Sequence, residues 1–176
     1  MLINLTDVFT SEGKVTKLQT DLEMETYVYQ GVTYKITDKT PVSLTFSNTG
    51  NGKAHMEGYV KVTCMLSCDR CLEDVIHEFD LFMTEDLLSP EVADDSSEES
   101  DEGRVFMEGY SINIEDLISN EILINWPTKV LCSEDCKGIC KQCGRDLNEG
   151  ECGCDTFVPD PRMAVIKDIF NANKEV

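Results

Sequence analysis

The sequence predicts an α+β fold in which an antiparallel β-meander precedes two helices and a C-terminal cysteine-rich segment. Three observations support this prediction. Apolar and polar residues alternate with a period of two in the first half of the chain, apolar residues recur at helical spacing in the second half, and cysteines crowd into short motifs. The chain has 176 residues and is 41% hydrophobic, which is enough for one domain with a core.

The predicted strands follow the alternation between Thr26 and Thr84, as expected for a sheet with one buried face. They are Tyr27–Tyr29, Thr33–Ile36, Val42–Phe46, Ala54–Leu66 and Val75–Met83. Turn residues separate them at Gln30-Gly31, in residues 48–52 and in residues 67–74. The longest predicted hairpin, from about Ala54 to Met83, therefore has cysteines at its tip.

Two helices are predicted in the second half. In the first, Ile114, Leu117, Ile118 and Ile122 fall at helical spacing, Asn113 can cap the N-terminus, and Pro127 stops the helix. The second begins at Asp160-Pro161, where proline suits the first helical position, and reaches Phe170.

Negative charge is the strongest feature of the composition. The chain has 34 acidic and 15 basic residues, for a formal net charge of −19, which argues against a broad basic surface that wraps nucleic acid. Residues 91–102 contain seven acids and no base, so we expect a disordered acidic loop there. We expect residues 1–90 to form the sheet region with the CxxC hairpin tip. Residues 103–176 would add the helices and the cysteine-rich segment, packed with residues 1–90 as one domain.

The compartment can be inferred from what the sequence lacks. No apolar run is long enough for a membrane span, and the N-terminus has no basic region followed by an apolar one. We therefore expect a soluble, cytoplasmic protein with no membrane partner. In a reducing compartment disulfides are disfavoured, so the nine cysteines need another explanation.

The cysteine spacing predicts metal binding. The C-terminal cysteines read C-x3-C-x3-C-x2-C-x8-C-x-C, and close pairs on tight turns suit a tetrahedral zinc site. In the run CKQCG, the glycine after Cys143 permits a positive φ, as in a zinc-knuckle turn. The predicted metal ligands are Cys68, Cys71, Cys132, Cys136, Cys140, Cys143, Cys152 and Cys154.

Spacing favours one division of these eight cysteines into two sites. Cys140, Cys143, Cys152 and Cys154 can close a site locally as a small ribbon. Cys68 and Cys71 would then join Cys132 and Cys136 and clamp the sheet to the C-terminal segment. A competing site made of Cys132, Cys136, Cys140 and Cys143 stays open, as does iron in place of zinc. Sites filled by four thiolates would be structural and closed to catalytic water.

The ninth cysteine, Cys64, shares a strand face with apolar residues, so we expect a buried core thiol. Cys64, Cys68 and Cys71 also read C-x3-C-x2-C, the spacing of iron–sulfur enzymes that use S-adenosylmethionine, but too little chain follows for the barrel such enzymes need. His55 and His77 have no motif partner and are expected on strand faces. We therefore expect no enzyme and no small-molecule substrate.

Three segments together resemble the YceD family of large ribosomal RNA subunit accumulation proteins. They are CDRCLEDV, VLCSEDCKGICKQCGRDLNEGECGCD and DPRMAVIKDIF, and the resemblance spans about residues 1–170. It implies a bacterial ribosome biogenesis factor that supports accumulation or processing of large-subunit ribosomal RNA. The family's CxxC falls on Cys68 and Cys71, and its later cysteines fall on the six from Cys132 to Cys154.

The partners implied are the pre-ribosomal large subunit, its RNA and basic ribosomal proteins. Direct RNA contact would involve Lys137, Lys141 and Arg145, three cations around the cysteine turn. As an alternative, the acidic chain could hold a basic ribosomal protein. The protein could also be a zinc-dependent hydrolase or a redox protein, which would need an exchangeable metal ligand or a reactive cysteine pair.

Overall fold

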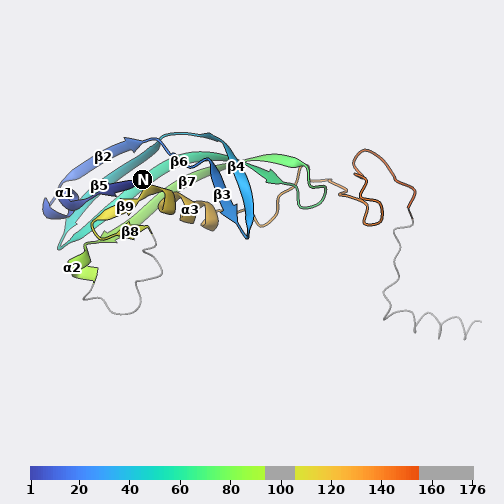
Figure 1. Cartoon of the computed structure of the whole chain (residues 1–176). Helices are drawn as coiled ribbons and strands as arrows, with labels where there is room; N and C mark the ends of the chain where they lie inside the picture. The colour runs from blue at the N-terminus through green and yellow to red at the C-terminus, as the bar shows by residue number, and fades with distance from the viewer. Residues whose placement is uncertain (94–105, 155–176) are drawn as a thin grey trace, which may run out of the picture. The chain divides into compact units, whose positions relative to one another are not determined.

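The computed structural model describes residues 1–93 and 106–154 and contains two compact units (Figure 1). The sheet unit consists of Met1–Ser67 and Asp74–Val130. The cysteine unit consists, in the described part of the chain, of the hairpin tip Cys68–Glu73 together with residues 131–154. Contacts therefore group the tip with the later cysteines, and residues 106–130 with the sheet. The expected packing of both parts as one domain stays a prediction.

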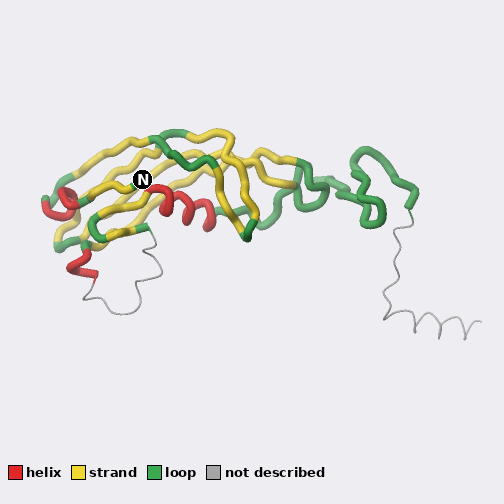
Figure 2. The backbone as a smooth tube through the Cα atoms, viewed as in Figure 1, coloured by secondary structure: helices red, strands yellow, loops and turns green. Residues whose placement is uncertain are grey.

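A six-stranded antiparallel sheet dominates the sheet unit (Figure 2). Its strands are β2 (Val15–Thr20), β3 (Thr26–Tyr29), β4 (Val32–Lys39), β5 (Val42–Gly50), β6 (Lys53–Ser67) and β7 (Asp74–Leu88). The order is β2-β5-β6-β4-β3, and β7 pairs with β6 along fifteen residues of each strand. All five predicted strands are present, and each is longer than expected because β-pairing continues beyond the predicted ends.

The predicted meander is confirmed, with one difference in its topology. β4 does not pair with β5: β5 pairs with the first half of β6 and β4 with the second half. Because β7 occupies one edge of β6 throughout, β4 and β5 share the other edge. The turn at Gln30-Gly31 is as predicted, with φ of 49° and 82°, the left-handed pair that a two-residue hairpin needs.

Several short elements were not predicted. A second sheet has the order β1-β9-β8, with β1 (Leu2–Asn4), β8 (Met107–Glu108) and β9 (Ser111–Asn113). Helix α1 is Thr6–Thr10 and helix α2 is Pro90–Ala93. These elements and β2 are too short, or too exposed, to leave a clear periodicity. The expectation of a disordered loop over residues 91–102 is wrong at its start, where α2 continues to Ala93; residues 94–102 lie outside the described part.

Helix α3 (Ile114–Ile124) matches the first predicted helix. The Asn113 side chain caps it by accepting a hydrogen bond from the backbone N–H of Glu115 at 3.2 Å. The helix ends three residues before Pro127, since proline disfavours helical geometry in the residue that precedes it. The predicted helix from Asp160 to Phe170 lies outside the described residues. The described residues therefore contain three helices, of which the sequence predicted one.

The core of the sheet unit lies on one face of β6 and β7, where alternate residues are buried. Cys64 belongs to this face and has no exposed surface, as predicted, and burial raises the pKa of its thiol to about 11. Leu117, Ile118 and Ile122 of α3 are also fully buried in this core. In the part of the chain that the structure describes, no helix is long and apolar enough to cross a membrane.

Trp126, just after α3, joins distant strands through aromatic contacts. Its ring stacks on Tyr29 of β3 at 4.4 Å between centroids and on Phe79 of β7 at 5.8 Å. It also lies 5.1 Å from the ring of Tyr34 in β4. One side chain therefore ties the end of α3 to strands from both sides of β6.

We predict that Trp126→Ala destabilises the sheet unit by about 3 kcal/mol, because the substitution removes contacts to three strands at once. Phe82→Ala is the matched control, since Phe82 is 74% exposed and should cost less than about 1 kcal/mol. Urea unfolding followed by far-ultraviolet circular dichroism measures both free energies. Equal losses would contradict the role given to Trp126.

Candidate metal centre

The cysteine unit contains two CxxC turns with the same backbone geometry, one at Cys68–Cys71 and one at Cys140–Cys143. In the hairpin tip, the N–H of Leu72 donates to the carbonyl of Cys68 at 3.0 Å, and Leu72 has a φ of 65°. In the later turn, the N–H of Gly144 donates to the carbonyl of Cys140 at 2.8 Å, and Gly144 has a φ of 73°. The left-handed residue was expected at Gly144, but Leu72 adopts it without glycine's freedom.

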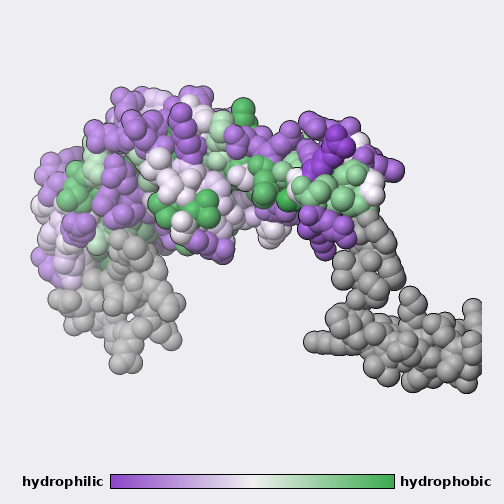
Figure 3. All heavy atoms as spheres, turned by 45° about the vertical axis from the view of Figure 1, so that its right-hand side comes forward, coloured by the Kyte–Doolittle hydropathy of each residue, from purple (hydrophilic) through white to green (hydrophobic). Residues whose placement is uncertain are grey.

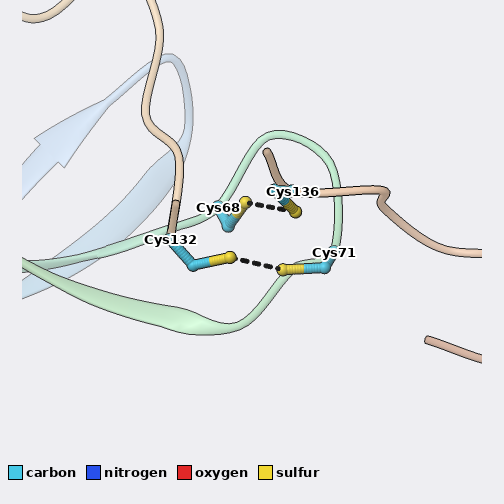
Figure 4. Close-up of side chains that lie close together, drawn as sticks. All are labelled: Cys68, Cys71, Cys132 and Cys136. Atoms are coloured by element: carbon cyan, nitrogen blue, oxygen red, sulfur yellow. Dashed lines mark hydrogen bonds between the residues drawn. The ribbon is translucent and has the colours of Figure 1, made fainter. Parts of the chain in front are cut away.

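The first cysteine group combines the hairpin tip with a segment 61 or more residues later (Figure 4). Its members are Cys68, Cys71, Cys132 and Cys136, and their four sulfur atoms lie within 4.8 Å of one another. The Sγ atoms of Cys68 and Cys136 are 3.8 Å apart, and those of Cys71 and Cys132 are 3.4 Å apart. Cys132 is exposed, whereas the other three side chains are buried.

The second cysteine group closes locally, as its spacing predicts. Its members are Cys140, Cys143, Cys152 and Cys154, again with all sulfur atoms within 4.8 Å. A short ribbon holds it: Ile139 and Asp146 form an antiparallel bridge, and the N–H of Leu147 donates to the carbonyl of Gly138 at 2.8 Å. Only Cys140 is buried in this group, so it is more open to solvent than the first.

Backbone N–H groups point at the first sulfur of each CxxC turn. Burial alone would raise the pKa of Cys68, but the N–H groups of Cys71, Arg70 and Cys132 donate to its sulfur and lower the pKa to about 6. The N–H groups of Cys143 and Gln142 lower the pKa of Cys140 to about 6 in the same way. Each turn therefore favours a thiolate at its first cysteine, which is the form that binds metal.

Two other sulfurs, one in each group, resist ionisation. The neighbouring sulfurs of Cys143 and Cys152 raise the pKa of Cys154 to about 12. At Cys71, the N–H of Glu73 favours the thiolate, but burial and three nearby sulfurs outweigh it and raise the pKa. Four thiolates so close together repel one another unless a cation lies among them.

The sulfur spacing fits a tetrahedral ion. Zn–S bonds of about 2.3 Å in a regular tetrahedron place the sulfur atoms about 3.8 Å apart, close to the distances in the first group. Two groups of four cysteines could therefore hold metal ions. The sulfurs fall into the division that the spacing favoured, and the competing set of Cys132, Cys136, Cys140 and Cys143 is not brought together.

Arg70, which lies between Cys68 and Cys71 in the sequence, holds the hairpin tip against the later chain. Its guanidinium donates to the carbonyl of Cys136 at 2.5 Å, and its own carbonyl accepts the N–H of Ile139 at 3.1 Å. Gly138 permits this approach, because a Cβ there would lie 2.9 Å from the Arg70 carbonyl oxygen. These contacts could not be predicted from the sequence, since Arg70 and Gly138 are 68 residues apart.

Asn148 links the two cysteine groups. It lies in the ribbon of the second group, yet its side-chain N–H donates to the Sγ of Cys136 in the first group at 3.4 Å. Its side-chain oxygen accepts the N–H of Lys137 at 2.7 Å, which fixes the amide orientation. A hydrogen bond donated to a sulfur stabilises its thiolate form, so Asn148 supports the first group without being one of its four cysteines. The sequence signals no such role for it.

The other residues singled out in the sequence are three cations of the cysteine unit and two histidines of the sheet unit. Lys137, Lys141 and Arg145 are all exposed around the second turn. His55 lies on β6, where its Nδ1 is 2.7 Å from a carboxylate oxygen of Asp86 on β7. His77 lies on β7 with its ring edge-on to Phe79. Both histidines are therefore on strands, as predicted.

We predict that Gly138→Ala destabilises the cysteine unit by about 2 kcal/mol more than Gly144→Ala. Both glycines have a positive φ, of 76° and 73°, so the backbone cost is shared. Only at Gly138 would the new Cβ meet the Arg70 carbonyl, whereas nothing lies within 4 Å at Gly144. Amide hydrogen exchange across Cys136–Asn148 measures the difference, and equal effects would show that the approach of Arg70 is unimportant.

Comparison with protein families identifies one match. The family model described as large ribosomal RNA subunit accumulation protein YceD matches residues 56–170, which include both cysteine groups. No solved structure matches the chain.

Relatives of known sequence occur in bacteria and in plants. An uncharacterized protein of Mycobacterium tuberculosis is 32% identical over 119 residues, which are 67% of this chain and 56% of that protein. The large ribosomal RNA subunit accumulation protein YCED homolog 1, chloroplastic, of Arabidopsis thaliana is 27% identical over 131 residues, 58% of this chain and 40% of that protein. Its Zea mays counterpart is 27% identical over 148 residues, 66% and 49% respectively.

The chain thus spans about half the length of the curated relatives it matches. The family match nevertheless covers more than half of this chain and contains all eight clustered cysteines. The chain belongs to the YceD family of large ribosomal RNA subunit accumulation proteins.

Proposed function

We propose that this protein supports the accumulation of large-subunit ribosomal RNA without catalysing a reaction, and that two structural zinc ions hold its cysteine unit together. The zinc proposal rests on one observation, that eight cysteines lie in two groups of four with their sulfur atoms close together. The ribosomal part rests on membership of the YceD family and on the names of the plant relatives.

Zinc is the ion best suited to these groups. Four thiolates in a tetrahedral arrangement are typical of structural zinc, which has no redox chemistry and tolerates this ligand set well. Four sulfurs fill all four positions, so water has no place on the ion. A closed site of this kind contributes folding free energy to the segment that supplies its ligands.

The polar residues of the sheet unit give little support for catalysis. The pair of His55 and Asp86 lies on exposed strand positions, with the His55 side chain 35% and the Asp86 side chain 85% exposed. General acid–base catalysis needs a substrate held beside the group in a site that limits water. A binding or scaffolding role in ribosome biogenesis therefore agrees better with these residues than a hydrolase or redox role.

A basic ribosomal protein is a second candidate for the direct partner, beside ribosomal RNA. Lys137, Lys141 and Arg145 are the three bases of residues 131–154, and the same segment contains five acids. Each zinc with four thiolates would add a net charge of about −2. The unit would then repel phosphates overall, so the charge favours a basic protein, while the three exposed cations leave room for a local RNA contact.

The metal content tests the zinc proposal. We expect the purified chain to bind two zinc ions, and Cys71→Ser and Cys143→Ser to lose one each, because either change removes a ligand of one group. Cys64→Ala is the control and should keep both ions, since Cys64 lies in the sheet unit's core. Inductively coupled plasma mass spectrometry with thiol titration measures this. One ion in the unchanged chain, or loss of both ions in Cys143→Ser, would contradict two independent sites.

The ribosomal role can be tested in cells. We expect deletion of the gene to lower the ratio of large-subunit to small-subunit ribosomal RNA, and the unchanged gene to restore it. Cys71→Ser should fail to restore the ratio, whereas Cys64→Ala should restore it if the protein accumulates normally. Quantitative RNA electrophoresis and immunoblotting measure both quantities. An unchanged ratio in the deletion strain would overturn the proposed function.

A further inference from the structure

A groove runs between the edge of β3 and the side of α3 in the sheet unit. Its volume is about 370 Å³. Its lining consists of Thr26, Tyr27 and Val28 from β3 and of Asp116, Ser119, Asn120 and Leu123 from α3. Three consecutive residues of a strand line a groove together when the groove borders the strand's edge rather than one face.

The helical side of the groove is a single face of α3. Positions 116, 119, 120 and 123 have the i, i+3, i+4, i+7 spacing that places residues on one side of a helix. The core-facing residues Leu117, Ile118 and Ile122 lie on a different side. Substitutions on the groove side of α3 can therefore be made without replacing the residues that pack α3 into the core.

The strand side presents backbone groups with no partner strand. Tyr29 and Val32 flank the two-residue turn at Gln30-Gly31, and such a flanking pair exchanges hydrogen bonds. Because bonded and non-bonded pairs alternate, Val28 and Thr26 direct their N–H and C=O groups away from β4. The N–H of Ile36 donates to the carbonyl of Glu25 at 2.9 Å, as this alternation requires.

Within residues 1–93 and 106–154, no strand pairs with that outer edge of β3. Two N–H and two C=O groups are thus directed into the groove, about 7 Å apart along the strand. This spacing matches alternate residues of an added strand. An extended peptide laid beside α3 could therefore form up to four backbone hydrogen bonds with β3.

We propose that this groove binds an extended segment of a basic partner protein, which adds to β3 as a further strand. The inference goes beyond the proposed function, because it assigns a surface and a mode of recognition, and it can fail while that function stands. Backbone pairing would supply affinity, and the side chains of α3 would select the sequence.

The charge and the apolar residues of the groove define this partner. Of the seven lining residues, Asp116 alone is charged, and Glu25 directly precedes β3. Val28 is 63% and Leu123 50% exposed, so each offers apolar surface. Space-filling representation shows apolar groups as separate patches among hydrophilic ones on the visible face (Figure 3). An extended segment that alternates basic and apolar residues satisfies these features.

The same charges disfavour two other occupants. RNA would bring phosphates toward the carboxylate of Asp116. A second copy of this chain would bring its own excess of acids, since the net charge is −19. A basic protein segment is attracted by both the groove and the molecule as a whole.

Backbone recognition is tested by removing one N–H without changing charge. The probe is a short fluorescein-labelled peptide of alternating Lys and Val, and binding to the full chain is followed by fluorescence anisotropy. Val28→Pro should weaken binding about tenfold, because Val28 loses the N–H directed at the peptide while the bonds of β3 to β4 remain. Val28→Ala keeps the N–H and is the matched control, with binding within about threefold of the unchanged chain.

The helical side is tested by filling the groove. Ser119→Arg should abolish binding of the probe, whereas Ser43→Arg, which adds the same side chain on exposed β5, should not. Circular dichroism confirms that each variant folds. In hydrogen exchange, the amides of Thr26 and Val28 should gain protection when the probe binds to the unchanged chain.

Four results would overturn the proposal. The first is that Val28→Pro and Val28→Ala bind the probe equally well, and the second is that a matched peptide of alternating Glu and Val binds as tightly as the probe. The third is that an RNA oligonucleotide, and not the peptide, protects the amides of Thr26 and Val28. The fourth is that these amides become protected when only the concentration of the chain is raised. The first two would indicate non-specific attraction or no strand addition. The third would indicate an RNA site, and the fourth self-association.

Discussion

Crowding of sulfur atoms is the constraint on which the cysteine unit depends. Each group places four sulfurs within 4.8 Å of one another, and four thiolates at that distance cannot coexist without a cation. Backbone N–H groups favour the thiolate form that a cation would bind, because they lower the pKa of Cys68 and Cys140 to about 6. The unit has few buried apolar residues in its described part, so a bound ion would supply much of its stability.

The sheet unit is stabilised differently. Alternate residues of β6 and β7 form an apolar face that α3 helps to bury, and the rings around Trp126 join strands from both sides of β6. Such a core needs no metal, and Cys64 takes part in it as an apolar side chain. The cysteines thus fall into two kinds: Cys64 is surrounded by apolar core residues, whereas the other eight lie beside one another in the two groups.

Short-range patterns in the sequence predicted the main strands, helix α3 and the cysteine groups, because each of these is marked by residues that lie close together in the chain. Period-two alternation gave the five main strands, helical spacing with Asn113 as cap gave α3, and close cysteine pairs gave the two groups of four. Contacts between distant residues could not be predicted in this way. Arg70 with Gly138, and Asn148 with Cys136, meet only because the chain folds, and Leu72 adopts a left-handed φ that its residue type disfavours. Likewise, no sequence signal places β4 and β5 along the same edge of β6.

We propose that each cysteine group holds one zinc ion through four sulfur ligands. X-ray absorption at the zinc edge of the purified chain tests it most directly, since it reports the type, number and distance of the ligand atoms. We expect four sulfur atoms at about 2.3 Å around each of two ions, with no nitrogen or oxygen ligand. A spectrum that requires a nitrogen or oxygen ligand, or one with a zinc–zinc distance typical of a shared cluster, would contradict it.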